Sequence, residues 1–279
     1  MAAERGVRTV VGTQARVSPA VVKLRELLWG ADRVVGQVVS TDVVGSFGPR
    51  LQGWAAEALY FLEVGSGGSA LQIRFGHFVD AFLYVLGGGA GGKSEAKGNG
   101  FARWHSTLVT NGKEVKIYDV PYSGLAKVIA EAPETASRVV RPTAPDEILL
   151  HGVLEGGAVA SLHFGTGPSD PNGLGLRWLI TGTEGTIEVT QPEGMGLLQS
   201  VGMKILVRRN GGEVEEVPVD WGLEGEWKQY GQMQIMANTG RLYKAWAEGK
   251  TEGLMDFEQA VKVHQLLDDM IELAEKESA

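Results

Sequence analysis

Three side chains between residues 69 and 87 have the types and the spacing for acid–base chemistry. His77, Asp80 and Tyr84 stand at positions i, i+3 and i+7, so on a helix all three lie on one face. A carboxylate one turn from an imidazole can accept its N–H, fix its tautomer and raise its pKa, which favours proton transfer near neutral pH. We therefore predict that His77 is an acid–base group, Asp80 its orienting partner and Tyr84 a pocket residue. The alternative is a half-buried structural histidine that caps the preceding turn.

The segment that carries these residues is predicted to change from strand to helix. Ala70 to Arg74 is strand-like, the break falls at Phe75 and Gly76, and an aromatic-rich helix follows. Arg74, adjacent to the break, and Phe75, within it, are candidates for substrate binding. The Arg74 side chain could steady a carbonyl or carboxylate of a ligand, and a surface ion pair is the competing interpretation.

The same segment resembles the substrate domain of the glucose–fructose oxidoreductase and inositol dehydrogenase family (Gfo/Idh/MocA). Its fungal branch, which includes the galactose-regulon repressor, has the pattern GGxxLxIxFGHxxDAxxYxLG. The matching positions here are Gly67-Gly68, Leu71, Ile73, Phe75-Gly76-His77, Asp80-Ala81, Tyr84 and Leu86-Gly87. Arg177 to Thr190 and Leu242 to Ala274 also agree with the family, so the resemblance covers nearly the whole chain.

The resemblance and the order of the elements predict the same fold class. Strand-like segments cluster between about residues 34 and 219 with helices at both ends, which favours an α+β fold. The resemblance implies a C-terminal domain of the Gfo/Idh/MocA type, with an open, mostly antiparallel sheet that helices cover on one face. In that family the other face can support a homodimer, so we expect a homodimer through the open sheet face.

The N-terminal residues predict a domain boundary. Val7 to Thr13 is a β-branched apolar run, typical of a buried strand, and Ser18-Pro19 begins a helix that ends before Gly30. In the resembling family this strand closes the nucleotide-binding domain and this helix leads into the second domain. We therefore interpret residues 1–30 as a remnant strand and linking helix, and residues 31–279 as the substrate domain, with the Rossmann domain absent.

No nucleotide cofactor and no metal are expected. A dinucleotide site needs a strand, a glycine turn at a helix N-terminus and an acid for the ribose. One formal G-x-G-x-x-G occurs at Gly87, Gly89 and Gly92, but it follows a predicted helix and is interpreted as a surface loop. The family's catalytic lysine would lie upstream of this chain, and the place of its aspartate, four residues before the histidine, is taken by Ile73. Hydride transfer by this chain alone is not expected.

The middle of the chain is predicted to supply the sheet. Val34 to Val44 is a β-rich run, and Asn111-Gly112 predicts a hairpin over Thr107 to Asp119. Pro121 to Pro145 is interpreted as an irregular surface excursion. Glu147 to Phe164 is predicted to form two strands about the turn at 155–157.

Three residues of these strands are further candidates for substrate binding, namely His151, His163 and Trp178. Whether the two histidines share a face depends on the register of the strands, which the sequence does not determine. A histidine on a strand face is more often a packed or surface residue, and that alternative stays open for both.

Composition excludes several classes of protein. The net charge is −8 without a basic block, so nucleic acid and anionic membrane surfaces are not expected as partners. The chain has no cysteine, which excludes disulfides, thiolate metal sites and a cysteine nucleophile. The charged N-terminus and the lack of a long apolar run predict a cytoplasmic protein without a membrane span.

Three classes of function fit these features. The first is a cofactor-independent enzyme of small-molecule metabolism that binds a hydrophobic substrate and catalyses a non-redox cyclisation, including a pericyclic one, or an isomerisation. The second is a repressor-like binding protein without catalysis. The third is a fragment of an NAD(P)-dependent sugar or polyol oxidoreductase. We predict the first class, because holding a substrate in a reactive conformation needs no cofactor.

Overall fold

The computed structural model describes residues 2–48, 53–87, 99–167, 170–192, 196–199, 202–222, 224–225 and 234–278. The helices are α1 (Pro19–Trp29), α2 (Gly76–Leu86), α3 (Tyr122–Glu131), α4 (Gln234–Ala247) and α5 (Phe257–Ser278). The strands are β1 (Val38–Ser46), β2 (Gly53–Ala55), β3 (Phe101–Val109), β4 (Val115–Tyr118), β5 (Arg138–Val140), β6 (Glu147–Leu154), β7 (Val159–Gly165), β8 (Leu174–Gly182), β9 (Gly185–Pro192), β10 (Lys204–Arg209) and β11 (Val214–Val217).

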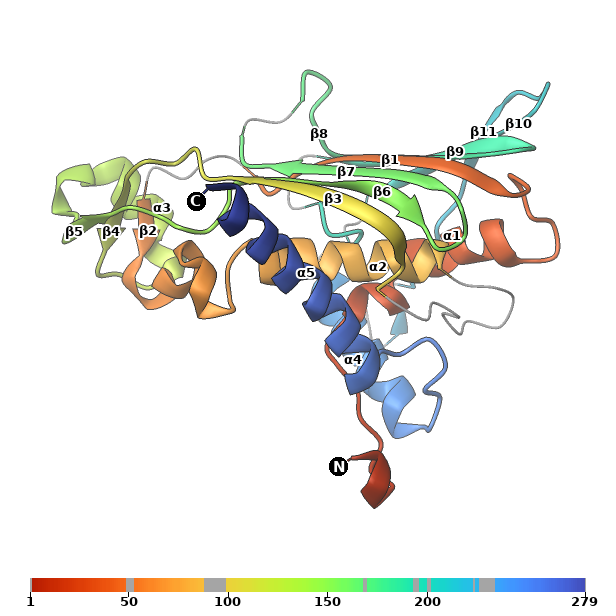
Figure 1. Cartoon of the computed structure of the whole chain (residues 1–279), viewed down its shortest axis with the longest axis horizontal. Helices are drawn as coiled ribbons and strands as arrows, with labels where there is room; N and C mark the ends of the chain where they lie inside the picture. The colour runs from red at the N-terminus through yellow and green to blue at the C-terminus, as the bar shows by residue number, and fades with distance from the viewer. Residues whose placement is uncertain are drawn as a thin grey trace.

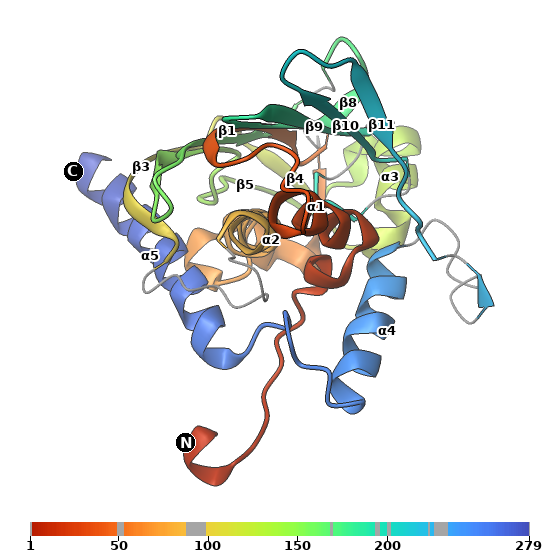
Figure 2. The ribbon, with the colours of Figure 1, turned by 90° about the vertical axis from the view of Figure 1, so that its right-hand side faces the viewer.

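The predicted α+β class is confirmed. Among the described residues, an eight-stranded sheet has the order β11-β10-β9-β8-β1-β7-β6-β3, and its pairs are antiparallel except for β1 with β7. Helices α1 and α2 lie directly under one face of this sheet, α5 runs beside α2 and packs on the edge strand β3, and α4 lies farther from the sheet (Figures 1 and 2). A second sheet of β2, β4 and β5 stands at one end of the large sheet beside α3 (Figure 1).

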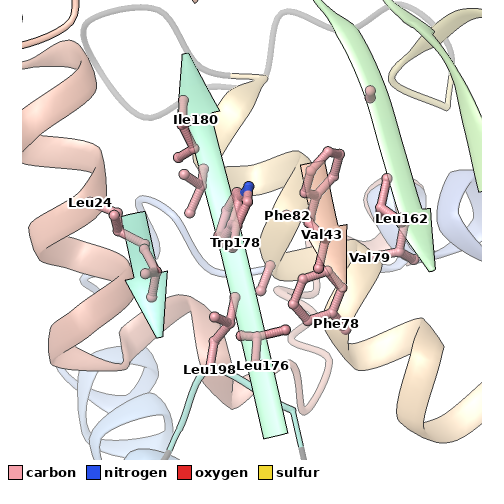
Figure 3. Packing of buried hydrophobic residues seen from close by; sticks show 14 of the residues in the cluster. Leu24, Val43, Phe78, Val79, Phe82, Leu162, Leu176, Trp178, Ile180 and Leu198 are labelled. Carbon is pink, nitrogen blue, oxygen red and sulfur yellow. The ribbon is translucent and has the colours of Figure 1, made fainter. Parts of the chain in front are cut away.

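The core fills the space between the large sheet and α2. Successive strand residues point to opposite faces, so in β8 Trp178 is fully buried while Arg177 is exposed. The rings of Phe78 and Phe82 pack against Trp178 with centroids 6.1 and 5.5 Å away (Figure 3). The Trp178 indole N–H donates to the Thr41 hydroxyl at 2.7 Å. Each buried ring contributes roughly 1.5–3 kcal/mol, so this aromatic layer holds α2 in place.

Several local predictions are confirmed. Helix α1 begins at Pro19 and ends before Gly30, although the Ser18 hydroxyl donates to the Leu198 carbonyl at 3.0 Å and makes no cap bond. The turn between β6 and β7 falls where expected, and Gly157 there has a φ of +89°, which favours glycine.

Three local predictions are wrong, the first two because contacts with distant parts of the chain replace the expected local pairing. No strand is assigned to Val7–Thr13, whose Val11 N–H donates instead to Met255 in the loop before α5. The hairpin at Asn111-Gly112 does not form, because β3 pairs with β6 and β4 pairs with β2 and β5. The segment 121–145, expected to be irregular, contains α3 and β5. Gly89 and Gly92 of the formal glycine motif lie outside the described residues.

The outer face of the large sheet carries exposed apolar side chains from several strands, including Val44 at 63% and Val159 at 57% exposed. A second copy could bury this face, since exposed apolar patches commonly mark interfaces. We expect the purified chain to have the mass of a dimer by light scattering and Val159→Lys to have that of a monomer. Val22→Lys, on the exposed side of α1, is the matched control. A wild-type monomer at tens of micromolar would contradict the expectation.

Candidate functional site

The segment before His77 is helical from its start. Leu71–Phe75 forms a π-helical turn that continues into α2, and the flanking residues Ala70 and Gly76 both have right-handed helical angles. The predicted strand at 70–74 and the break at 75–76 are therefore wrong. A single π turn rotates the residues after it relative to those before it, and such turns are frequent at functional sites. His77 is the second residue of α2, two positions after this turn.

His77 is partly buried, and its environment differs from the predicted one. Its Nδ1 atom is buried without a hydrogen-bond partner in the described part of the chain. Burial lowers the pKa of the imidazole, and the nearby Asp80 charge only partly opposes this effect. The predicted increase in the pKa is therefore wrong. His77 is neutral at pH 7, because its pKa lies below the ordinary value of about 6.5.

Asp80 is bound to a different partner. Its carboxylate accepts hydrogen bonds from Arg16, with Nη2–Oδ1 at 2.6 Å and Nε–Oδ2 at 3.0 Å. Asp80 is 1% and Arg16 7% exposed, so this is a buried ion pair. Arg16 also donates to the Gln259 side chain at 3.0 Å, which connects the turn at Gln14–Val17 to α2 and α5. Asp80 therefore acts on His77 through its charge, and the predicted hydrogen bond to Nδ1 is not formed.

Tyr84 is held by two arginines. The guanidinium carbons of Arg16 and Arg25 lie 4.8 and 4.2 Å from the centre of its ring, and Arg25 also donates to the Tyr84 carbonyl. Burial lowers the pKa of Arg25, with the Tyr84 charge opposing. Neither arginine was found from the sequence, because both come from the N-terminal segment and only the folded chain brings them to α2.

Arg74, three residues before His77, has partners of its own. It donates to the Phe47 carbonyl at 3.0 Å, and its guanidinium lies 4.7 Å from the centre of the Phe61 ring. Burial lowers its pKa, with Tyr122 opposing. The surface ion pair considered for Arg74 is therefore wrong. Its side chain ties the start of α2 to the end of β1 and to the aromatic groups near the small sheet.

The other predicted binding residues do not join His77. Phe75 and Trp178 are fully buried core residues, so their predicted contact with a substrate is not supported. His151 and His163 do share a face, but it is the outer face of the sheet, opposite the helices. There His151 stacks on His105 with ring centroids 5.7 Å apart. Of the predicted residues, the candidate site on α2 therefore keeps His77. Asp80 and Tyr84 lie on the same helix and are held by Arg16 and Arg25.

The described residues contain no group of three or more histidine, cysteine, aspartate or glutamate side chains placed to hold a metal ion. No helix within the described ranges has the length and apolar composition that crossing a membrane requires.

Comparisons with known proteins identify the family of the chain. The family described as "Gal80p, C-terminal domain" matches residues 19–191. The galactose/lactose metabolism regulatory protein of Saccharomyces cerevisiae is 25% identical over 208 residues, which are 72% of this chain and 41% of that protein. The dehydrogenase aclE of Aspergillus oryzae is 21% identical over 276 residues, 98% of this chain and 64% of that protein. The chain thus spans less than two thirds of these relatives.

Solved structures show the same fold. A super-repressor mutant of Gal80p from Saccharomyces cerevisiae superimposes with a TM-score of 0.72 at 21% identity, over 99% of this chain and 65% of that one. Levoglucosan dehydrogenase in its apo form gives a TM-score of 0.62 at 17% identity, over 97% of this chain and 65% of that one. Regulators and dehydrogenases thus share this architecture, so the shared fold alone does not identify an activity.

Proposed function

The chain belongs to the family of Gal80p C-terminal domains, and on this premise we propose that it binds a small hydrophobic molecule beside His77 and catalyses a cofactor-independent, non-redox cyclisation or isomerisation. The observation that carries the proposal is the state of His77. Burial lowers the pKa of its imidazole, and its buried Nδ1 has no hydrogen-bond partner in the described residues. A buried polar atom without a partner is costly, which favours a ligand that supplies one.

The chemistry follows from what these side chains can do. A neutral imidazole can accept a proton or a hydrogen bond from a bound substrate, and such proton transfer contributes about 10²–10⁴-fold to a rate. Holding the substrate in a reactive conformation can contribute about 7–11 kcal/mol. The Arg16–Asp80 pair and the arginines around Tyr84 keep the face of α2 rigid beside the imidazole. None of these groups carries a hydride.

One alternative has its own supporting observation. The similarity to the dehydrogenase aclE extends over 98% of this chain. This favours the substrate domain of an oxidoreductase, in which a nicotinamide held outside the described residues would exchange a hydride with a substrate while His77 exchanges the proton. A regulator-like binding role is supported by the similarity to the yeast regulatory protein.

Nucleotide titration tests the proposal against the oxidoreductase alternative. The 279-residue chain is titrated with NADH and NADPH, and reduced-nicotinamide fluorescence and thermal shift are recorded. We expect no saturable binding, together with conversion of a hydrophobic metabolite in nucleotide-free extracts followed by mass spectrometry. Saturable micromolar binding would contradict the proposal. A product that matches the substrate in mass would support isomerisation or cyclisation, whereas a change of two hydrogens would indicate redox chemistry.

A further inference from the structure

A cavity of about 410 Å³ lies on the outer face of the large sheet, away from His77. It is at the end of β7, β1 and β8, where His163, Val44 and Arg177 stand side by side on three neighbouring strands. Neighbouring strands are about 4.8 Å apart, so the backbones of His163 and Arg177 are separated by roughly 10 Å. A volume of this size is typical of small-molecule sites.

The polar groups that line the cavity present mainly acceptors. The Glu147 carboxylate lies 3.3 Å from His163 Nε2 through its Oε2 atom. An ionised carboxylate only accepts, so His163 Nε2 is the donor in this contact. Asp170 accepts the N–H groups of Asn172 and Leu174, each at 2.8 Å, with Oδ1 alone. Glu147 Oε1 and Asp170 Oδ2 have no hydrogen-bond partner within the described ranges.

The positive charge at the cavity is already balanced. Arg177 donates from Nε at 2.9 Å and from Nη2 at 2.6 Å to a single oxygen of Glu188, a residue that does not line the cavity. Among the other lining residues that the structure describes, no lysine or arginine balances the charges of Glu147 and Asp170. Their field therefore favours a cation in the cavity.

From these contacts we propose that the cavity is a binding site for a small primary amine in its ammonium form. The ammonium N–H groups donate to Glu147 Oε1 and Asp170 Oδ2, the two carboxylate oxygens without a partner within the described ranges. Val44 and Leu174 supply apolar contacts for a short alkyl chain. The described lining residues include no phenylalanine, tyrosine or tryptophan, so a quaternary ammonium, which has no N–H and relies on aromatic rings, is not expected to bind. The site is independent of the proposed function, since it lies on the opposite face of the sheet.

The test is a calorimetric titration of the full chain with putrescine and ethanolamine, with tetramethylammonium and inositol as contrasting probes. We expect saturable binding of the primary amines only. Glu147→Gln and Asp170→Asn are each expected to weaken binding by about tenfold or more, because each removes a charge-assisted hydrogen bond. Glu216→Gln makes the same change of charge on the same sheet face in β11, and it should leave binding within about twofold of wild type, as expected for a distant surface charge.

A second variant displaces the Glu147 carboxylate without removing its charge. A Cβ atom at Gly165 would lie 2.3 Å from the Glu147 carboxylate, so Gly165→Ala must push that carboxylate aside. We expect Gly165→Ala to weaken amine binding as Glu147→Gln does. The titration is repeated on Val159→Lys, which keeps the face accessible if wild-type copies pair through it. Failure of both proteins to bind any primary amine, equal binding by all variants, or preferential binding of inositol or tetramethylammonium would overturn the proposal.

Discussion

Asp80→Asn is expected to lower the free energy of unfolding by about 3–5 kcal/mol, which is the usual cost of removing one partner from a buried ion pair. The substitution keeps the shape of the side chain but removes its charge. The Arg16 guanidinium, 7% exposed, is then left without its anion between the Gln14–Val17 turn and α2. Urea unfolding at pH 7 followed by circular dichroism measures the change. Asp268→Asn, an exposed charge on α5, is the matched control and should change stability by less than about 0.5 kcal/mol.

A double substitution separates the ion pair from general packing. If the cost arises from an uncompensated charge, replacing both partners by apolar residues, Arg16→Met with Asp80→Leu, should recover most of the stability that Asp80→Asn loses. A loss of less than about 1 kcal/mol in Asp80→Asn would show that water reaches Arg16 and that the pair is not a buried one. A double variant as unstable as the single one would instead assign the cost to the packing of α2.

The parts of the fold that could be predicted are those set by local periodicity. The alternation of apolar and polar residues predicted the β6–β7 pair with its glycine turn. A proline at the first helical position predicted the start of α1, and both are observed. The hairpin at Asn111-Gly112 failed although its local signal is strong. The N–H groups of both residues donate to the Asp146 carboxylate at 2.8 and 2.9 Å, and β3 pairs with β6 instead. Contacts with Asp146 and with β6, both distant in sequence, therefore replace the hairpin that the local sequence predicts.

The sequence predicted that His77 and Asp80 share a helix, but it did not predict their electrostatics. The spacing of His77 and Asp80 placed them on one helix, as observed. The sign of the His77 pKa shift depends on which group donates hydrogen bonds to the Asp80 carboxylate and on how deeply the imidazole ring is buried. The donor to the Asp80 carboxylate is Arg16, 64 residues earlier in the chain, and burial lowers the pKa of His77. No periodicity in the sequence connects two residues at that separation, so only the folded chain reveals the pair.

His77→Leu is expected to reduce turnover of the substrate by about 10²–10⁴-fold, the usual contribution of a proton-transfer group. Its stability at pH 7 should stay equal to that of wild type or rise, because leucine removes a buried polar atom that lacks a partner in the described residues. A residue retained only for structure would behave in the opposite way, with a loss of stability and no specific loss of activity. His264→Leu, an exposed histidine on α5, is the matched control and should change neither property.

The same variant should alter the dependence of stability on pH. The pKa of His77 is lowered in the folded protein, so below about pH 6.5 the unfolded chain binds more protons at this residue than the folded chain does. The wild-type free energy of unfolding therefore falls as the pH drops from about 6.5 through the lowered pKa, and His77→Leu should lack this part of the decrease. Urea unfolding at a series of pH values measures it. If His77→Leu keeps full turnover while this pH difference appears, the imidazole is buried as described but transfers no proton, and catalysis must come from holding the substrate in its reactive conformation.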